Sequence, residues 1–317
     1  MNIRTQKYNV AGHDFSISMP QGTPLWNMLS NYGPFLKENN CCDTSSSEAE
    51  IFSLKVSVIA NISGLPFSME DIVKSTDIDN DITFIRHLLL NSGHSVFILS
   101  ISKENLGDAG FLVMSPHSPS VDLYIPDGST DNLPLLKHNI FVINNSLMLL
   151  FAYFTATRST LLIHASVAVN GRYAQVFLGR SGTGKSTHTR LWLENIPGTW
   201  LLNDDNPALR IMPDGNVLAF GTPWSGKTPC YKNSSAILHG IVRLSQAPHN
   251  CISRLTGIRA YAALSPSASA VKWEKDSADG IHSTITGIIT KVPVFHLECL
   301  PDSDAAQLCH DTLYNPQ

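Results

Sequence analysis

Three features that would narrow the function of this chain are missing from its 317 residues: a long apolar run, a basic excess and a cysteine framework. The most apolar stretch, Leu147–Thr155, is far shorter than the roughly 20 residues that cross a bilayer. The start, MNIRTQKYNV, is too polar for a secretory signal. We therefore expect a protein without a membrane partner.

The charge balance excludes a second class of partner. Asp and Glu number 26 against 22 Lys and Arg, and the formal net charge is −4. Proteins that bind nucleic acid usually carry a positive stripe, so no nucleic-acid partner is predicted. A phosphate can still be held by a backbone loop, which needs little net charge.

The six cysteines lack the spacing of a disulfide scaffold or a zinc knuckle. Cys41 and Cys42 are adjacent, and the other four are scattered along the chain (Cys230, Cys251, Cys299 and Cys309). Reduced thiols in a cytoplasmic protein are the simplest interpretation. What the chain does have is apolar sequence: 43% of its residues are hydrophobic, which is enough for a sizeable core.

A loop-like run, YIPDGSTDNLP at Tyr124–Pro134, divides the sequence into two halves. Its Pro, Gly, Asp and Ser content is typical of a connection, so we predict one domain over 1–132 and a second over 133–317. The first fits an α+β domain, and we find no catalytic constellation in it.

The elements expected in the first half follow from residue propensity. Apolar residues at helical spacing support one helix (Ile82, Ile85, Leu88 and Leu89). The predicted elements are a strand over 8–18 broken at Gly12, a short helix over 24–36, a strand over 52–60, a helix or helix pair over 68–91, and a strand over 96–101.

The second half begins with a pattern that leads towards a motif. We predict a buried helix over 147–156 and a strand over 161–169. The dipeptide Asn170-Gly171 is a strong hairpin signal, and the segment 173–178 then forms the returning strand.

The run GRSGTGKS at Gly179–Ser186 matches the phosphate-binding pattern G-x-x-x-x-G-K-[ST] at every fixed position. Its glycines let backbone N–H groups converge on phosphate oxygens, and the helix that follows adds its positive end. We expect Lys185 to reach the β- and γ-phosphates of ATP and Ser186 to ligate Mg²⁺ or Mn²⁺. A glycine-rich turn that matches by coincidence is the alternative. The predicted nucleotide contacts are Gly179, Ser181, Gly182, Thr183, Gly184, Lys185, Ser186 and Thr187.

Two adjacent carboxylates, Asp204 and Asp205, end the next short apolar strand. One helix and one turn fill the interval from Lys185, so this strand is expected to return beside the phosphate loop. One carboxylate can then bind the metal while the other accepts a proton from an attacking hydroxyl. Which aspartate does which is open, and a polar strand end without a catalytic role is the alternative.

Three further residues are candidates for the same site. His164 interrupts an apolar strand, where a packed core histidine competes with a ligand to metal or phosphate. Lys227 belongs to a second Gly-Lys-Thr run on a Pro- and Gly-rich loop, and it either neutralises charge on a transferred phosphoryl group or is solvated. Trp224 on that loop either stacks on a base or anchors the loop.

The run from His164 to Asp205 resembles the core of HPr kinase/phosphorylase and of ATP-dependent phosphoenolpyruvate carboxykinase. The carboxykinase pattern His-Cys-Ser stands here as His-Ala-Ser, and its loop G-L-S-G-T-G-K-T stands as GRSGTGKS. The Gly-Asp-Asp-Glu-His run appears as Asn203-Asp204-Asp205-Asn206, without its acidic and histidine tail. The segments GTPWSGKTPCYKN and ECLPD are similar to the standalone HPr-kinase-related proteins of bacteria.

This resemblance implies an α/β fold: a C-terminal P-loop kinase core with a mixed sheet, preceded by a smaller α+β domain. It implies phosphate and metal roles for Lys185 and Ser186, base and metal roles for Asp204 or Asp205, and a supporting or metal role for His164. The leading hypothesis is an ATP-dependent phosphotransferase that acts on a hydroxyl of a small molecule or of a peptide or protein serine.

Two other functions fit the same motifs. One is a phosphoenolpyruvate carboxykinase-like enzyme acting on an oxo-acid, although the arginine and lysine set that binds its substrate is not found in this sequence. The other is a nucleotide-binding sensor without phosphotransfer. The chain also lacks a recognisable signature for binding HPr, so HPr is not the expected acceptor.

Overall fold

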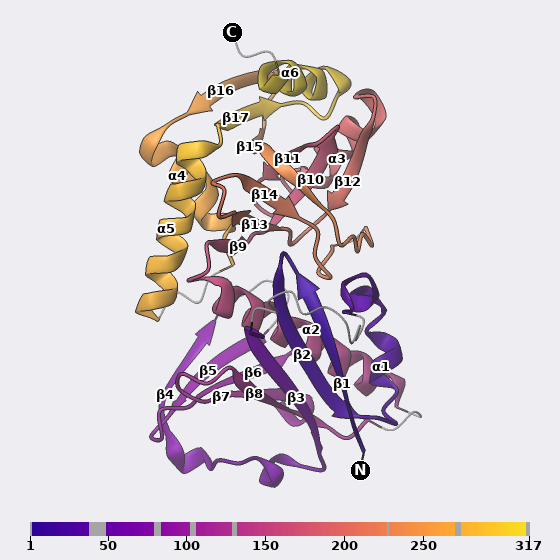
Figure 1. Ribbon diagram of the computed structural model, residues 1–317, viewed down its shortest axis with the longest axis vertical. Helices are drawn as coiled ribbons and strands as arrows, with labels where there is room; N and C mark the ends of the chain where they lie inside the picture. Colours follow the sequence, from indigo (N-terminus) through magenta and orange to yellow (C-terminus); the bar gives the residue numbers. More distant parts are fainter. Residues whose placement is uncertain are drawn as a thin grey trace. The chain divides into compact units, whose positions relative to one another are not determined.

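Each half of the chain forms a mixed sheet of its own in a computed structural model, so the fold is mixed α/β (Figure 1). The chain divides into two compact units, Met1–Leu150 and Phe151–Gln317. The expected boundary at 132/133 is where helix α2 (Leu133–Thr155) begins, and the division falls inside this helix. The structure describes residues 2–37, 49–78, 84–101, 106–128, 132–226, 228–269 and 274–314.

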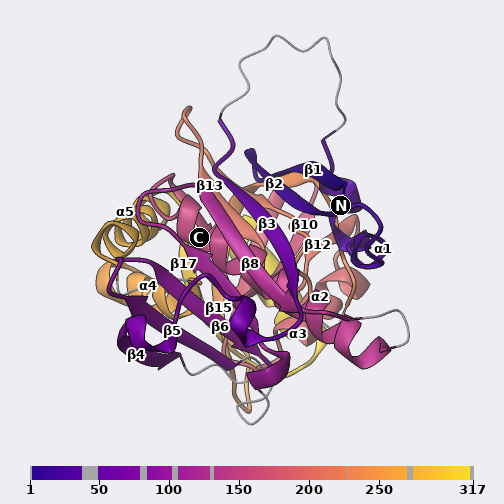
Figure 2. The same ribbon diagram turned by 90° about the horizontal axis from the view of Figure 1, so that it is seen from below.

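The first unit is built on a sheet whose middle strands are parallel. Its described elements are β1 (Ile3–Val10), β2 (His13–Pro20), α1 (Leu25–Met28), η1 (Ser30–Phe35), β3 (Phe52–Ile59), η2 (Ile62–Gly64), η3 (Met69–Asp71), β4 (Ile72–Ile78), β5 (Phe84–Leu90), β6 (Ser95–Ser100), η4 (Leu106–Asp108), β7 (Gly110–Met114) and β8 (Ser120–Pro126). The strand order is β1-β2-β3-β8-β7-β6-β5-β4. β2, β3 and β8 are parallel neighbours, and β3 and β8 lie side by side in Figure 2.

Several predicted elements of this unit are confirmed. The predicted strand over 8–18 is a hairpin of β1 and β2, and it turns where Ala11 and Gly12 adopt positive φ angles of 51° and 79°. Two residues at positive φ match the twist of the flanking strands. The short helix over 24–36 is α1 followed by the 3-10 helix η1, and the strands over 52–60 and 96–101 are β3 and β6.

The predicted helix over 68–91 is wrong, because this segment contains β4 and β5. β5 buries Phe84, Leu88 and Leu90 at a spacing of two or four residues, which is the period of a strand. Its pairing with β6 places Leu88 opposite Val96 in one apolar cluster. Pairing between distant segments thus overrides the local spacing. Ile82 lies outside the described residues.

The sheet of the second unit carries the motifs. Its described elements, after α2, are β9 (Thr160–Leu162), β10 (Ala165–Asn170), β11 (Tyr173–Leu178), α3 (Lys185–Asn195), β12 (Thr199–Asn203), β13 (Ala208–Ile211), β14 (Val217–Phe220), β15 (Ser235–Gln246), β16 (Cys251–Leu255), α4 (Gly257–Leu264), η5 (Ser265–Ser267), α5 (Lys275–Lys291), β17 (Val294–Cys299) and α6 (Ser303–Tyr314). The order is β12-β10-β11-β15-β14-β13-β9, and β17 joins β15 to β16.

Both faces of this sheet are covered, which explains why β10 and β11 are almost entirely apolar. Val167 and Val169 point to one face and pack in a core with residues of α4 and α5, which lie beside each other in Figure 1. Ala168 and Phe177 point to the other face, in a core with Trp192 of α3 and residues of α6. The alternation of side chains along each strand supplies both cores.

The local predictions for this unit largely hold. Asn170-Gly171 turns the hairpin of β10 and β11, as expected. The predicted strand over 161–169 is broken at Ile163 and His164, because β9 pairs with β13 whereas β10 pairs with β11 and β12. The helix expected over 147–156 is the end of α2, which begins at Leu133.

Helix α2 is longer than predicted. By length and composition its 23 residues are sufficient to cross a membrane, and half of its most apolar window is buried. A core helix of a water-soluble protein has the same length and composition.

Candidate functional site

The motifs of the second unit meet at one edge of its sheet. β10 is antiparallel to β11 and to β12, so β11 and β12 run in the same direction. The carboxyl ends of β11 and β12 therefore lie at the same edge as the beginning of β10. The phosphate loop, the paired aspartates and His164 occupy these three strand ends. This bears out the expected position of the carboxylates near the loop.

The loop Gly179–Gly184 connects β11 directly to α3, which begins at Lys185. Gly182 and Gly184 have φ angles of 78° and 106°, which favour glycine. A Cβ on Gly179 would lie 3.0 Å from the Cβ of Thr183, so the loop is closed tightly on itself. No side chain caps the first turn of α3. Its N–H groups and positive end therefore suit an anion.

Lys185 lies between the loop and the carboxylates. Its Nζ donates a hydrogen bond to the carbonyl of Gly179 at 2.9 Å. Burial lowers the pKa of Lys185, and the charges of Asp205 and Asp204 oppose that shift. Ser186, the next residue, lines a pocket together with Asp204. The structure thus brings the predicted phosphate-binding and carboxylate residues together.

Asp204 is buried and held by a chain of hydroxyl groups. Its Oδ1 accepts a hydrogen bond from Ser166 Oγ at 2.9 Å, and Ser166 Oγ accepts one from Thr189 Oγ1 at 2.7 Å. All three residues are at most 7% exposed. This series of hydrogen bonds runs from Thr189 on α3 through Ser166 on β10 to Asp204 at the end of β12. Thr189 follows Lys185 by one helical turn and therefore lies on the same face of α3. This spacing is the sequence signal that could have placed Thr189 near the site.

Asp205 is more exposed and pairs with His164. Their Oδ1 and Nε2 atoms are 3.4 Å apart. Burial raises the pKa of Asp205, against the opposing charges of His164 and Lys185. Burial, followed by the charge of Lys185, lowers the pKa of His164, so its imidazole is neutral at neutral pH. The packed core histidine considered from sequence is wrong, because His164 sits at the break between β9 and β10 with its side chain 47% exposed.

Asn203 positions this pair of aspartates, and no sequence pattern marks it as a functional residue. Its Oδ1 accepts hydrogen bonds from the backbone N–H groups of Asp205 and Asn206 at 2.9 and 3.0 Å. Its Nδ2 donates to Thr222 Oγ1 and to the carbonyl of Trp224, both at 3.2 Å. The side chain is fully buried. It therefore ties the carboxylate turn to the loop that begins at Gly221.

That second loop passes close to the carboxylates. A Cβ on Gly226 would lie 2.8 Å from the carbonyl oxygen of Asp204 and 3.2 Å from Cβ of Asp205. Trp224 is 6% exposed and packs against Phe151, with ring centroids 5.2 Å apart. This contact favours an anchoring role for Trp224 over base stacking. Lys227 lies outside the described residues.

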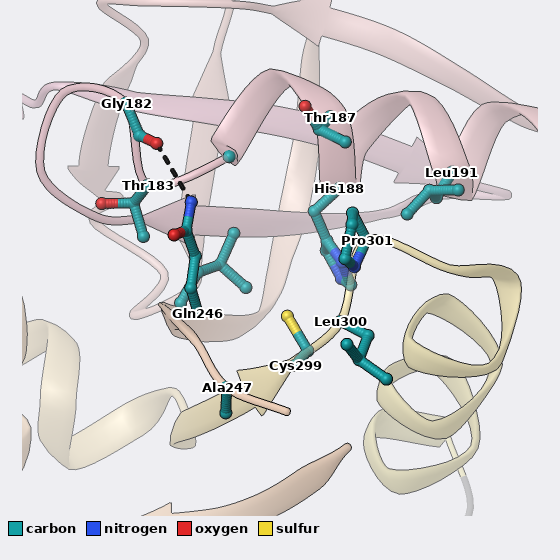
Figure 3. A pocket seen from close by; sticks show the side chains of 12 residues that line it. Gly182, Thr183, Thr187, His188, Leu191, Gln246, Ala247, Cys299, Leu300 and Pro301 are labelled. Atoms are coloured by element: carbon teal, nitrogen blue, oxygen red, sulfur yellow. Dashed lines mark hydrogen bonds between the residues drawn. The ribbon is translucent and has the colours of Figure 1, made fainter. Parts of the chain in front are cut away.

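Two pockets border the beginning of α3. The carboxylate pocket, of about 410 Å³, is lined by Ser186, Thr187, Thr189, Arg190, Leu193, Leu201, Asp204 and Thr228. The helix–strand pocket, of about 370 Å³, is shown in Figure 3 and lined by Gly182, Thr183, Gly184, Thr187, His188, Leu191, Leu244, Gln246, Ala247, Cys299, Leu300 and Pro301. Both volumes are typical of small-molecule sites, which span about 300–1,000 Å³.

The donor set at the carboxylate pocket fits Mg²⁺. Among the described residues, no three or more His, Cys, Asp and Glu side chains gather as a self-sufficient metal site. Magnesium does not require one, since it is commonly bound by one or two carboxylates, water and substrate phosphates. Ser186 and Asp204 provide hard oxygen atoms on one pocket wall.

No protein-family model matches this chain, and no curated protein matches it.

Proposed function

We propose that the second unit is a phosphotransferase of the P-loop kinase type, similar to the HPr kinase and carboxykinase group. It binds ATP on the loop Gly179–Ser186 and transfers the γ-phosphoryl group to a hydroxyl of a small molecule or of a peptide or protein serine. The observation that carries this proposal is the convergence of Lys185 and Ser186 with Asp204 and Asp205 at one sheet edge.

The phosphate-binding half of the mechanism follows from the loop. Backbone N–H groups at the start of α3 surround the phosphates, and the helix dipole stabilises their negative charge. Lys185 turns from the carbonyl of Gly179 to the β- and γ-phosphates. Ser186 and Asp204 would hold Mg²⁺, which would supply charge stabilisation to the phosphates. Ser166 and Thr189 keep Asp204 in position.

The transfer half of the mechanism assigns the proton to Asp205. The acceptor hydroxyl oxygen forms a bond to the γ-phosphorus as the bond to the β–γ bridging oxygen breaks, and ADP leaves. The hydroxyl proton passes to Asp205, whose raised pKa suits a general base better than that of an ordinary aspartate. His164 orients this carboxylate through the contact at 3.4 Å. Catalysis rests on positioning and charge stabilisation.

We also propose a cytoplasmic location. The four described cysteines, Cys230, Cys251, Cys299 and Cys309, are free thiols. Free thiols in this number are typical of a reducing compartment.

Binding and turnover of Mg-ATP test the proposal with matched variants. Lys185→Ala is expected to weaken ATP binding by about 10–100-fold, the effect of a lost charge-assisted hydrogen bond. Asp205→Asn is expected to bind ATP normally and to lower turnover by about 10²–10⁴-fold. Calorimetry measures the first effect and ADP release the second. Lys275→Ala and Asp279→Asn, on the exposed side of α5, serve as controls.

Two results would contradict the proposal. Unchanged ATP affinity in Lys185→Ala removes the phosphate role of the loop. Unchanged turnover in Asp205→Asn removes the base. Carbon dioxide release from oxaloacetate in the presence of ATP would assign the site to carboxykinase chemistry instead.

A further inference from the structure

The second loop is fixed to the end of β12 on both sides of Thr228. Before it, Gly226 packs so closely against the carbonyl oxygen of Asp204 that a Cβ would lie 2.8 Å from that atom. After it, the Cys230 thiol donates a hydrogen bond to the carbonyl of Leu202 at 3.4 Å. Thr228 itself is exposed and lines the carboxylate pocket. The loop therefore holds an accessible threonine beside the carboxylate turn.

The carboxylate pocket has hydroxyl groups on two of its walls. Ser186, Thr187 and Thr189 all belong to α3, which follows the phosphate loop. Among the described residues that line the pocket, Thr228 carries the one hydroxyl that does not belong to this helix. In-line transfer requires the attacking oxygen to approach the γ-phosphorus from the side opposite to the leaving ADP. Because the phosphate loop and α3 hold ADP, the attacking hydroxyl is expected on another wall, where Thr228 lies.

Arg190 supplies positive charge to the same pocket. It follows Ser186 by one helical turn, and it is the only Lys or Arg among the described residues that line the pocket. Its Nε lies 3.9 Å from a carboxylate oxygen of Glu194, and the two side chains are 66% and 58% exposed. An exposed pair at this distance contributes little to stability, so the guanidinium is available to a stronger anion. A phosphate group is such an anion, because its oxygens match the two-pronged geometry of arginine.

We propose that Thr228 is phosphorylated by the site of its own chain and that Arg190 then holds the phosphate. This proposal rests on the proposed function, since ATP is the phosphoryl donor. Thr228 Oγ1 forms a bond to the γ-phosphorus as the bond to the β–γ bridging oxygen breaks, and ADP leaves with that electron pair. The hydroxyl proton passes to Asp205. Without Arg190 the phosphothreonine would face only the negative charge of Asp204, so the arginine is needed to stabilise it.

Mass spectrometry of the phosphatase-treated full chain after incubation with Mg-ATP tests the proposal. One phosphate is expected, on Thr228, and Asp205→Asn should slow its formation by about 10²–10⁴-fold. Because the reaction is intramolecular, its rate constant should not change when the protein is diluted about 100-fold. Thr228→Val removes the hydroxyl and should end the modification, whereas Thr228→Ser should keep it. Thr256→Val, at an exposed threonine before α4, is the control and should be modified normally.

The role of Arg190 is measured by the acidity of the phosphate. Phosphorus NMR follows the second ionisation of the phosphothreonine, whose ordinary pKa is about 6. A neighbouring guanidinium favours the doubly charged form, so Arg190→Ala should raise this pKa by about half a unit or more. Arg190→Lys keeps the charge and should raise it less. Arg259→Ala, at an exposed position of α4, is the control and should leave it unchanged.

The results separate this proposal from the proposed function. If ADP is released but Thr228 gains no phosphate, or gains it with a rate constant that rises with protein concentration, self-modification is overturned and the phosphotransferase stands. Equal phosphate incorporation in Thr228→Val and the wild type would overturn the site. An unchanged pKa in Arg190→Ala, or the absence of phosphate from that variant, would overturn the role of the arginine as the group that holds the phosphate. If bound ATP yields neither ADP nor phosphoprotein, the proposed function fails and this proposal fails with it.

Discussion

At the scale of single residues, Asn203 links the carboxylate turn to the loop that begins at Gly221. It is buried, and its side-chain hydrogen bonds join Asp205 and Asn206 to Thr222 and Trp224. An asparagine can do this because its amide both donates and accepts. The resemblance to carboxykinases places glycine at this position, so the local sequence provides no reason to expect a buried polar side chain with several hydrogen-bond partners. Its partners beyond residue 220 are brought near only by the fold.

We expect Asn203→Ala to lower the free energy of unfolding by about 2–4 kcal/mol, because several buried groups lose their partners. Turnover is expected to fall further than ATP affinity, since Asp205 loses its fixed turn. Chemical denaturation and steady-state kinetics measure the two effects. Asn195→Ala, at the exposed end of α3, is the control. A free energy of unfolding equal to that of the control would show that the hydrogen bonds of the Asn203 side chain are dispensable for stability.

The pH dependence of turnover is argued from Asp205. A general base acts only when deprotonated, and burial raises the pKa of this carboxyl from 3.8. Turnover is therefore expected to decline on the acid side at a higher pH than for an ordinary aspartate. Where His164 is protonated, on the acid side of neutrality, its charge lowers the pKa of Asp205, so His164→Gln should move the acid limb of the kcat profile to still higher pH.

The control for this shift is His249→Gln, which replaces an exposed histidine after β15. A kcat profile whose acid limb is the same in His164→Gln and in the wild type would contradict the coupling. An acid limb that moves to lower pH would show that His164 raises the pKa of Asp205 instead of lowering it.

At the scale of elements, the second loop and the carboxylate turn are packed too closely for a side chain. Gly226→Ala places a methyl group within 2.8 Å of the Asp204 carbonyl oxygen, so one of the two segments must move. We expect turnover to fall about tenfold or more, because small displacements of catalytic groups are costly. ATP affinity should change less. Gly22→Ala, where the added methyl group meets no atom within 4 Å, is the control.

How far the sequence predicts the elements depends on where the decisive contacts lie. The strand, loop and helix around Gly179–Ser186 and the hairpin at Asn170-Gly171 are predictable because adjacent residues determine them. The segment 68–91 was not, because its identity as β4 and β5 depends on pairing in the sheet. The Thr189–Ser166–Asp204 chain joins three elements, so only the fold reveals it.

At the scale of the whole molecule, every described residue of the proposed site belongs to the unit Phe151–Gln317. We therefore expect a shortened chain, residues 133–317, to bind Mg-ATP with the affinity of the full chain. It must keep all of α2, since a cut at the division after Leu150 would split that helix. Calorimetry compares the two chains. Loss of binding by a folded 133–317 chain would assign the first unit a direct role.

The hydrogen bond between Trp192 and His188 gives this protein an optical reporter of its own. Indole emission responds to changes in its hydrogen bonding and polarity, and Trp192 is fully buried away from bulk water. A ligand that packs against the His188 ring, which lines the helix–strand pocket, changes the surroundings of that bond. Occupation of the helix–strand pocket should therefore be visible in the fluorescence of an unlabelled protein, in real time and without a known phosphoryl acceptor.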